Sequence, residues 1–178
     1  MKLTALAALV AAAAVPAAAL AETVTGTDRQ NAARSCKALQ TSLGATAFKE
    51  TYGTNANRSN AFGRCVSTMA RAEAENRQSA QAACAAERAD ANFAAAHGGK
   101  TFAQHYGTGK AGANAFGRCV SGKTAQASAE DRRDVQNAAR RCAAERKSLG
   151  AAAFVAKYGT RANAFGKCVS KLAQGSGG

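Results

Sequence analysis

The chain has 178 residues, with 24 Lys and Arg against 11 Asp and Glu, so its formal net charge is +13. That excess bears on solubility and anionic partners rather than on the fold. No stretch after residue 21 is apolar enough to cross a bilayer, and no Gly-x-Ser-x-Gly, CxxC, CxxCH or phosphate-loop pattern is present, so no familiar enzyme class is indicated by a motif.

Residues 1–21 have the composition of a signal peptide. An early lysine is followed by an Ala/Leu/Val run, by Pro16, and by the cleavage-site pattern Ala19-Leu20-Ala21. We expect cleavage before Glu22, which leaves a net charge of +12; a retained membrane anchor is the alternative, because the run nearly spans a bilayer. The protein is therefore expected to be secreted or held in a cell envelope, which the Ala, Gly and Arg bias suggests to be bacterial.

An internal repeat organises the rest of the chain. The sequence NAFGRCVS at residues 60–67 returns at 114–121 and, as NAFGKCVS, at 163–170. Each copy is preceded by a cysteine, a glycine, a phenylalanine four residues later and then Tyr-Gly-Thr. The predicted domains are a signal peptide (1–21), an N-terminal segment (22–30), unit 1 (31–70), a helical connector (71–80), unit 2 (81–124), a second helical connector (125–136), unit 3 (137–173) and a disordered tail (174–178).

Each unit is predicted to hold three helices. In unit 1 the first helix carries an inward cysteine and is closed by Gly44 in the left-handed conformation. A short second helix places Phe48 and Tyr52 on one face. Asn60 is a good N-cap for the third helix, in which Phe, Cys and Val of the repeated motif form an inward stripe. The glycine of that motif, Gly63 in unit 1, is expected to allow close approach of the first helix of the same unit.

Six cysteines in an oxidising compartment favour three disulfides. Since the two cysteines of a unit lie on helix faces that meet, pairing within units is predicted. Pairing between neighbouring units, such as Cys65 with Cys84, is the alternative, but it requires a turn in a stretch of about 28 Å that has no turn residues. The predicted disulfides are Cys36 with Cys65, Cys84 with Cys119 and Cys142 with Cys168.

The predicted fold is all-α, with three tandem disulfide-stapled units joined by long or bent helices. The first connector lacks glycine and proline, so it is expected to be a continuous helix. A bend or break is expected in the second connector, which contains Gly122 and a capping box at Ser128 and Asp131. Because the inward positions are mostly alanine, the disulfides are expected to contribute about 3 to 4 kcal/mol each.

No catalytic, cofactor or metal site is predicted. The only histidines, His97 and His105, lie in unit 2 without a partner carboxylate nearby, so they are interpreted as surface residues. Glu87 and Glu145, which follow their cysteines at equivalent places, are interpreted as local salt-bridge partners.

One repeated feature does suggest binding. Every unit places a cation in its variable loop and another just before its second cysteine, on either side of a helix N-terminus that favours anions. Three such sites would suit a repeating polyanion, although solvated charges beside a helix cap are the alternative. The candidate anion-binding residues are Arg58, Arg64, Lys110, Arg118, Arg161 and Lys167.

The expected function is therefore that of a secreted, non-catalytic helical repeat protein that binds or structures an anionic polymer. The partner is expected among cell-wall polymers, polysaccharides, lipid head groups and nucleic acids; the sequence does not indicate an oligomeric state. A small secreted hydrolase or toxin with a site not recognisable from sequence is the alternative. A cationic protein that disturbs membranes is a further one, but the helices lack the wide apolar face that such a role needs.

Overall fold

The computed structural model describes residues 23–109, 111–160 and 162–175. These residues form seven helices and no strand, so the all-α prediction is confirmed. The predicted signal peptide, Lys110, Arg161 and residues 176–178 lie outside the described residues. The helices are α1 (Gly26–Tyr52), α2 (Ala61–Ala89), α3 (Phe93–Ala96), α4 (Phe102–Tyr106), α5 (Ala115–Leu149), α6 (Ala151–Tyr158) and α7 (Ala164–Gln174).

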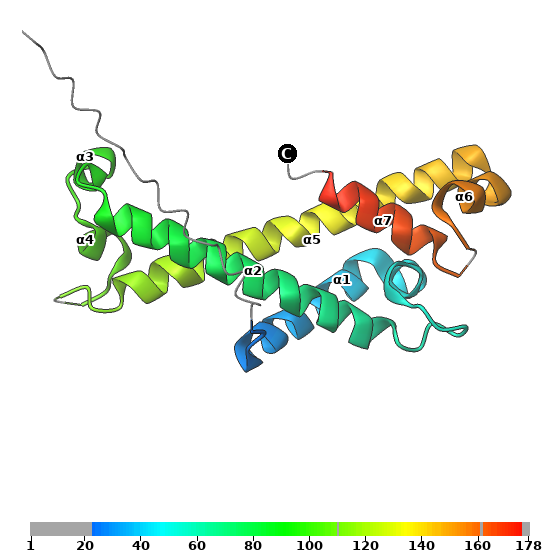
Figure 1. The fold of residues 1–178 in the computed structure, drawn as a ribbon, viewed down its shortest axis with the longest axis horizontal. Coiled ribbons are helices and arrows are strands. Elements are labelled where there is room, and N and C mark those ends of the chain that lie inside the picture. Colours follow the sequence, from blue (N-terminus) through cyan, green and yellow to red (C-terminus); the bar gives the residue numbers. More distant parts are fainter. Residues whose placement is uncertain (1–22, 110, 161, 176–178) are drawn as a thin grey trace, which may run out of the picture.

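Two long helices give the molecule its elongated shape. α5 runs along most of the long axis, α2 lies against it, α3 and α4 are at one end, and α6 is at the other (Figure 1). α1 and α7 pack against these long helices near the end that carries α6. Within the described residues, none of the helices is both long and apolar enough to span a membrane.

Both connectors are continuous helix. The first lies within α2, as predicted, but the expected break in the second is wrong, since α5 continues through it. The hydroxyl of Ser128 donates to the carbonyl of Thr124 at 2.8 Å instead of capping a new helix. Asp131 accepts a hydrogen bond from Asn76 of α2 at 2.8 Å, so its carboxylate is used between helices.

The repeated glycine after the first cysteine breaks the chain direction in units 1 and 3. Gly44 and Gly150 have the same backbone angles, φ +78° and ψ 159°, which side chains on other residues disfavour. Gly44 divides α1 into two helical segments, and Gly150 separates α5 from α6. In unit 2 the first helix ends earlier, at Ala89, and α3 occupies the extra residues.

The three disulfides join the two cysteines of each unit, as the repeat predicts. Each bond links the first helix of a unit to the helix that starts with the repeated motif, and all six cysteines are almost completely buried. The pairs are Cys36 with Cys65, Cys84 with Cys119 and Cys142 with Cys168.

The asparagine of the repeated motif closes the loop before it. Asn60 stands at the N-cap position of α2, but its side chain makes no capping hydrogen bond, so that part of the prediction is wrong. Its amide instead donates to the hydroxyl of Thr54 at 2.8 Å and accepts from the Thr54 backbone N–H at 3.0 Å. This contact explains why Tyr-Gly-Thr and Asn-Ala-Phe-Gly recur together. The equivalent side-chain pairs are Asn114 with Thr108 and Asn163 with Thr160.

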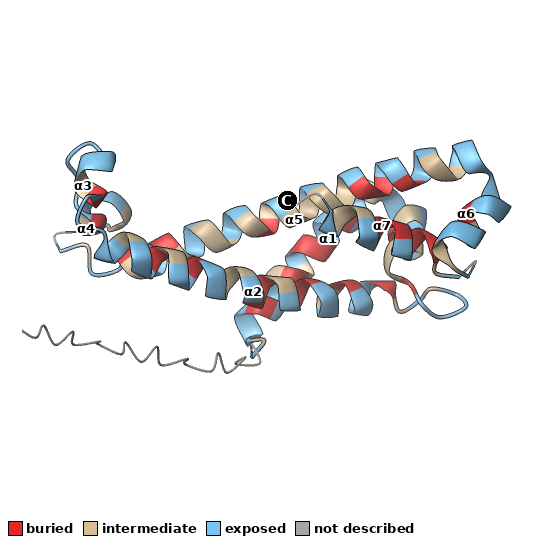
Figure 2. Cartoon of the chain, turned by 45° about the horizontal axis from the view of Figure 1, so that its top comes forward, coloured by how far each residue is buried: buried red, intermediate tan, exposed pale blue. Residues whose placement is uncertain are grey.

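The core consists of three small clusters, one in each unit. Those of units 1 and 3, around Phe48 and Phe154, share Leu43 and Val135 at their margins, so they form one continuous apolar region. The cluster of unit 2, around Phe93, stands apart at the other end. Figure 2 shows these buried positions as bands on the facing sides of the helices, while much of the helical surface is exposed.

The phenylalanine of the repeated motif is fully inward in only one unit. Phe165 is buried and Phe116 is half-buried, whereas Phe62 is 40% exposed. The predicted inward stripe is therefore wrong at Phe62. Phe62 still contacts the ring of Phe48, with 6.4 Å between ring centroids.

Candidate anion-binding cleft

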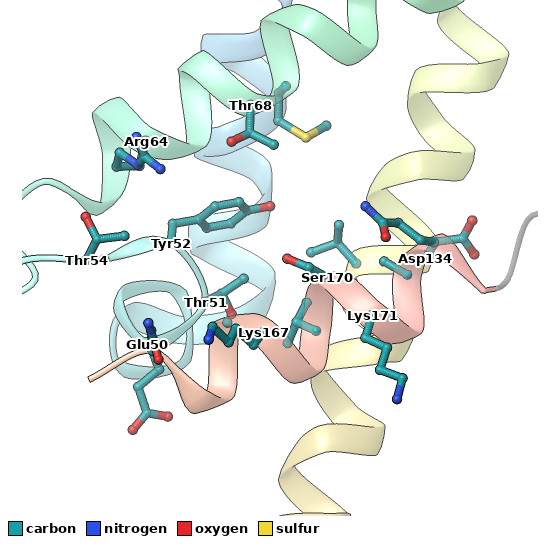
Figure 3. Close-up of a pocket in the computed structure, with 18 of the residues that line it drawn as sticks. Glu50, Thr51, Tyr52, Thr54, Arg64, Thr68, Asp134, Lys167, Ser170 and Lys171 are labelled. Carbon is teal, nitrogen blue, oxygen red and sulfur yellow. The ribbon is translucent and has the colours of Figure 1, made fainter. Parts of the chain in front are cut away.

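A cleft of about 760 Å³ lies where unit 3 packs on unit 1. Its walls come from the C-terminal end of α1, the first half of α2, the middle of α5, and α7 (Figure 3). This volume lies within the range of ordinary small-ligand sites. The residues that line it include Glu50, Tyr52, Arg64, Thr68, Met69, Asp131, Asp134, Val135, Lys167, Val169, Ser170 and Lys171.

The repeated glycine explains how the two units come this close. An added Cβ on Gly166 of α7 would lie 2.5 Å from the carbonyl oxygen of Thr51, so only glycine fits there. The same position in the other units, Gly63 and Gly117, has no neighbour within 4 Å of an added Cβ. The predicted close approach thus occurs only in unit 3, and it is made to unit 1 rather than to the first helix of the same unit.

Three cations surround the cleft. Arg64 extends from α2, and Lys167 and Lys171 extend from α7 one helical turn apart. All three are exposed, and none forms an ion pair with another described residue. Lys171 was not predicted, although its position four residues after Lys167 on the same helix was a usable signal.

The acids of the cleft are partly engaged within the protein. Glu50 pairs with Arg58 at 3.5 Å and with Arg146 at 3.0 Å, so it is neutralised by two guanidinium groups. Asp131 accepts the hydrogen bond from Asn76. Asp134 lies at the α5 side of the cleft (Figure 3). Among the described residues, no ion pair joins these acids to Arg64, Lys167 or Lys171.

The floor of the cleft is apolar and its walls carry hydroxyl groups. Met69 and Val169 are buried, and Val135 lies beside them on α5. Tyr52, Thr68 and Ser170 bring their hydroxyls to this region from three helices (Figure 3). Burial raises the pKa of Tyr52 to about 12, so its hydroxyl stays protonated at neutral pH and acts as a hydrogen-bond donor.

The predicted anion-binding residues are only partly brought together. Arg64 and Lys167 meet at the cleft, whereas Arg58 is paired with Glu50. Arg118 lies in unit 2 at the far end, where its guanidinium donates to the carbonyl of Tyr106 at 3.0 Å. The cleft thus combines the cations of two units. The remaining two candidates, Lys110 and Arg161, lie outside the described residues.

Glu87 and Glu145 form salt bridges, but the prediction of local pairing within their own helix is wrong, because both partners lie on other helices. Lys123 contacts Glu87 at 2.8 Å and Lys157 contacts Glu145 at 2.5 Å. The pKa of each carboxyl is lowered, because the ammonium and a tyrosine hydroxyl donate to it, although desolvation opposes this most strongly at Glu87. The tyrosine is that of the repeated Tyr-Gly-Thr, with O–O distances of 2.7 Å in unit 2 and 2.8 Å in unit 3.

A second, smaller groove of about 430 Å³ lies where α1, α2 and α5 cross. Its lining is strongly polar. Arg77 contacts Asp28 at 3.3 Å, and Arg132 donates to the hydroxyl of Ser35 at 3.1 Å. The groove joins the three longest helices through polar side chains rather than through an apolar core.

The acid at the centre of this groove is Glu73, which is only 3% exposed. Burial raises its pKa, while the neighbouring Ser128 hydroxyl and the charge of Arg132 act in the opposite direction. At Asp28 burial also opposes ionisation, but hydrogen bonds from Thr25 and the nearby Arg77 leave its pKa lowered. The pKa values of these two buried acids are thus shifted in opposite directions.

The two histidines lie together in unit 2. The ring of His97 stacks on Phe93 at 3.8 Å between centroids and meets the ring of His105 at 4.6 Å. His97 is half-buried, which corrects its interpretation as a surface residue, while His105 is exposed. Among residues 23–109, 111–160 and 162–175, no group of three or more His, Cys, Asp or Glu side chains is placed to hold a metal ion.

Comparisons with protein-family models, with curated proteins and with solved structures found no match to this chain. The cleft is therefore interpreted from its own residues and their chemistry.

Proposed function

We propose that this protein is a secreted, non-catalytic binding protein for an anionic polymer outside the cell or in its envelope. The polymer would lie across the cleft between units 1 and 3. Three disulfides, which persist in oxidising compartments, and the signal-like residues 1–21 support secretion.

The observation that carries the proposal is the grouping of Arg64, Lys167 and Lys171 around one cleft without ion-pair partners among the described residues. Two of the three acids that line the cleft are engaged within the protein. Glu50 forms ion pairs with Arg58 and Arg146, and Asp131 accepts a hydrogen bond from Asn76.

The charge of the whole chain acts in the same direction. The formal net charge of +12 that remains after removal of residues 1–21 attracts polyanions over a distance of about 10 Å at ordinary ionic strength. Such an attraction speeds encounter, while a defined group of cations at a cleft adds a preferred position. Binding of this kind weakens steeply with salt, because condensed counterions are released from the polymer.

Retention on immobilised heparin and on a phosphate-rich cell-wall fraction tests the proposal. The variant Arg64→Gln, Lys167→Gln, Lys171→Gln should elute at much lower salt than the wild type. Its plot of log affinity against log salt should lose a slope of about two to three, roughly one for each lost contact.

A matched control removes the same charges elsewhere. The variant Arg29→Gln, Lys100→Gln, Lys147→Gln also replaces one arginine and two lysines, and all three are exposed and outside both grooves. It should elute close to the wild type. Equal shifts in the two variants would show that net charge alone governs retention, and absence of wild-type retention would disprove the proposed function.

A further inference from the structure

Unit 1 departs from the other two units at one tyrosine. In units 2 and 3 the tyrosine of Tyr-Gly-Thr donates to a glutamate three residues after the first cysteine, Glu87 or Glu145. Unit 1 has Leu39 at that position, and this leucine is completely buried. Tyr52 therefore has no equivalent acceptor, and no hydrogen bond joins its hydroxyl to another described residue.

The Tyr52 hydroxyl, which lacks this acceptor, lies in the cleft. Among the described residues, Tyr52 is the only aromatic side chain that lines it, and Figure 3 shows the hydroxyl directed toward its middle, near Thr68 and Ser170. A half-buried donor without a partner is unfavourable unless water or a ligand satisfies it. Because Leu39 stands where the other units have a glutamate, the Tyr52 hydroxyl is an available donor at the contact between units 1 and 3.

The combination of groups favours one kind of polyanion. We infer that the cleft binds a sugar residue of an anionic polysaccharide, with the Tyr52 hydroxyl donating a hydrogen bond to a sugar oxygen. This inference rests on the proposed function and names its substrate class. A sugar ring has an apolar C–H face for the half-buried Val135 on the floor of the cleft and an acid group for the surrounding cations. Its hydroxyls suit Tyr52, Thr68 and Ser170.

Other polyanions fit these groups less well. A bare polyphosphate chain has no apolar face to pack on the floor of the cleft beside Tyr52. Its oxygens can only accept hydrogen bonds, whereas a sugar hydroxyl can also donate to the hydroxyl oxygens of Thr68 and Ser170. A nucleic-acid strand is usually held by bases stacked on aromatic rings. The one aromatic ring here already packs against Phe48, with 5.1 Å between centroids, as part of the core of unit 1.

Calorimetric titration with three probes tests the inference, namely a sulfated heparin tetrasaccharide, an inorganic polyphosphate of equal charge and a single-stranded oligonucleotide. The wild type should bind the tetrasaccharide most tightly. Tyr52→Phe, which removes only the hydroxyl, should weaken tetrasaccharide binding about fivefold and leave polyphosphate binding unchanged.

The other tyrosines provide matched controls. Tyr106→Phe and Tyr158→Phe remove hydroxyls that are bonded inside the protein, so both should bind the tetrasaccharide as the wild type does. An NMR spectrum of protein with isotope-labelled tyrosines is a second measurement. Of the three tyrosine signals, the tetrasaccharide should shift that of Tyr52 alone. This spectrum detects contact even where Tyr52→Phe alters folding.

The possible results separate the two proposals. Unchanged tetrasaccharide affinity in Tyr52→Phe together with an unmoved Tyr52 signal would overturn the inference, while the cation variants could still support the proposed function. Equal or tighter binding of polyphosphate or oligonucleotide would overturn the preference for a sugar. If none of the three probes bound the wild type, both proposals would fail.

Discussion

Units 1 and 3 pack against each other at one end of the molecule, whereas unit 2 stands at the other end of the α2–α5 pair (Figure 1). All three have the same disulfide, the same Asn–Thr contact and the same short motif. In units 1 and 3 the apolar clusters merge through Leu43 and Val135, while the cluster of unit 2 is formed by residues of unit 2 alone. The same repeated unit can therefore bury its apolar cluster by itself, as unit 2 does, or share it with a neighbouring unit, as units 1 and 3 do.

The largest expected loss of stability comes from removing the disulfide of a single unit. Cys84→Ser with Cys119→Ser opens a loop of 35 residues in unit 2, which should lower its local stability by about 4 kcal/mol. We expect hydrogen exchange followed by mass spectrometry to show lost protection throughout residues 93–106, because no other unit supports them.

Cys142→Ser with Cys168→Ser is the matched change in unit 3. It removes a similar amount of stability, but α7 stays packed against α1, so peptides from residues 164–174 should retain much of their protection. Equal loss of protection in the two double variants would contradict the idea that units 1 and 3 support each other.

A smaller effect with opposite signs is expected at the repeated glycine. Gly166→Ala pushes a methyl group against the Thr51 carbonyl and should lower the free energy of unfolding by about 2 kcal/mol. Gly63→Ala and Gly117→Ala meet open space within helices and should raise it by up to about 1 kcal/mol. Urea denaturation measures all three, and a stabilised Gly166→Ala protein would show that the contact between the units is not close.

The smallest effect concerns the polar groove between the two ends. Because burial raises the pKa of Glu73 above its ordinary value of 4.5, Glu73 contributes most to stability below that pH and less as the pH rises through the raised value. Glu73→Gln should therefore flatten the fall in Tm between pH 4.5 and 8. The exposed Glu75 on the same helix is the control, and Glu75→Gln should follow the wild-type profile. A Glu73→Gln profile equal to that of the wild type would show that this acid ionises freely.

Local chemistry predicted the parts of each unit well. Gly44 and Gly150 break the chain direction because the left-handed conformation suits glycine, and the cysteines meet because their helix faces do. The same reasoning was wrong at Ser128, whose hydroxyl bonds within the helix, since the contacts of α5 with α2 outweigh a local capping signal.

The cleft could not be predicted from one unit at a time. It depends on α5 remaining straight, which brings unit 3 back beside unit 1, and on Gly166 having a neighbour that Gly63 and Gly117 lack. One signal was present in the sequence, namely Leu39 in the place of a glutamate. The consequence of this leucine depends on the tyrosine–glutamate hydrogen bonds of units 2 and 3, which are visible only in the structure.

Because α5 is one continuous helix, it fixes the distance and the orientation between unit 2 and the cleft. With 35 residues the helix is about 52 Å long, and it carries Cys119 near its start and Cys142 near its end. Insertion of a single residue would lengthen this rod by only about 1.5 Å but rotate unit 2 by about 100° around it. The helix therefore holds unit 2 at one distance and one rotation relative to the cleft.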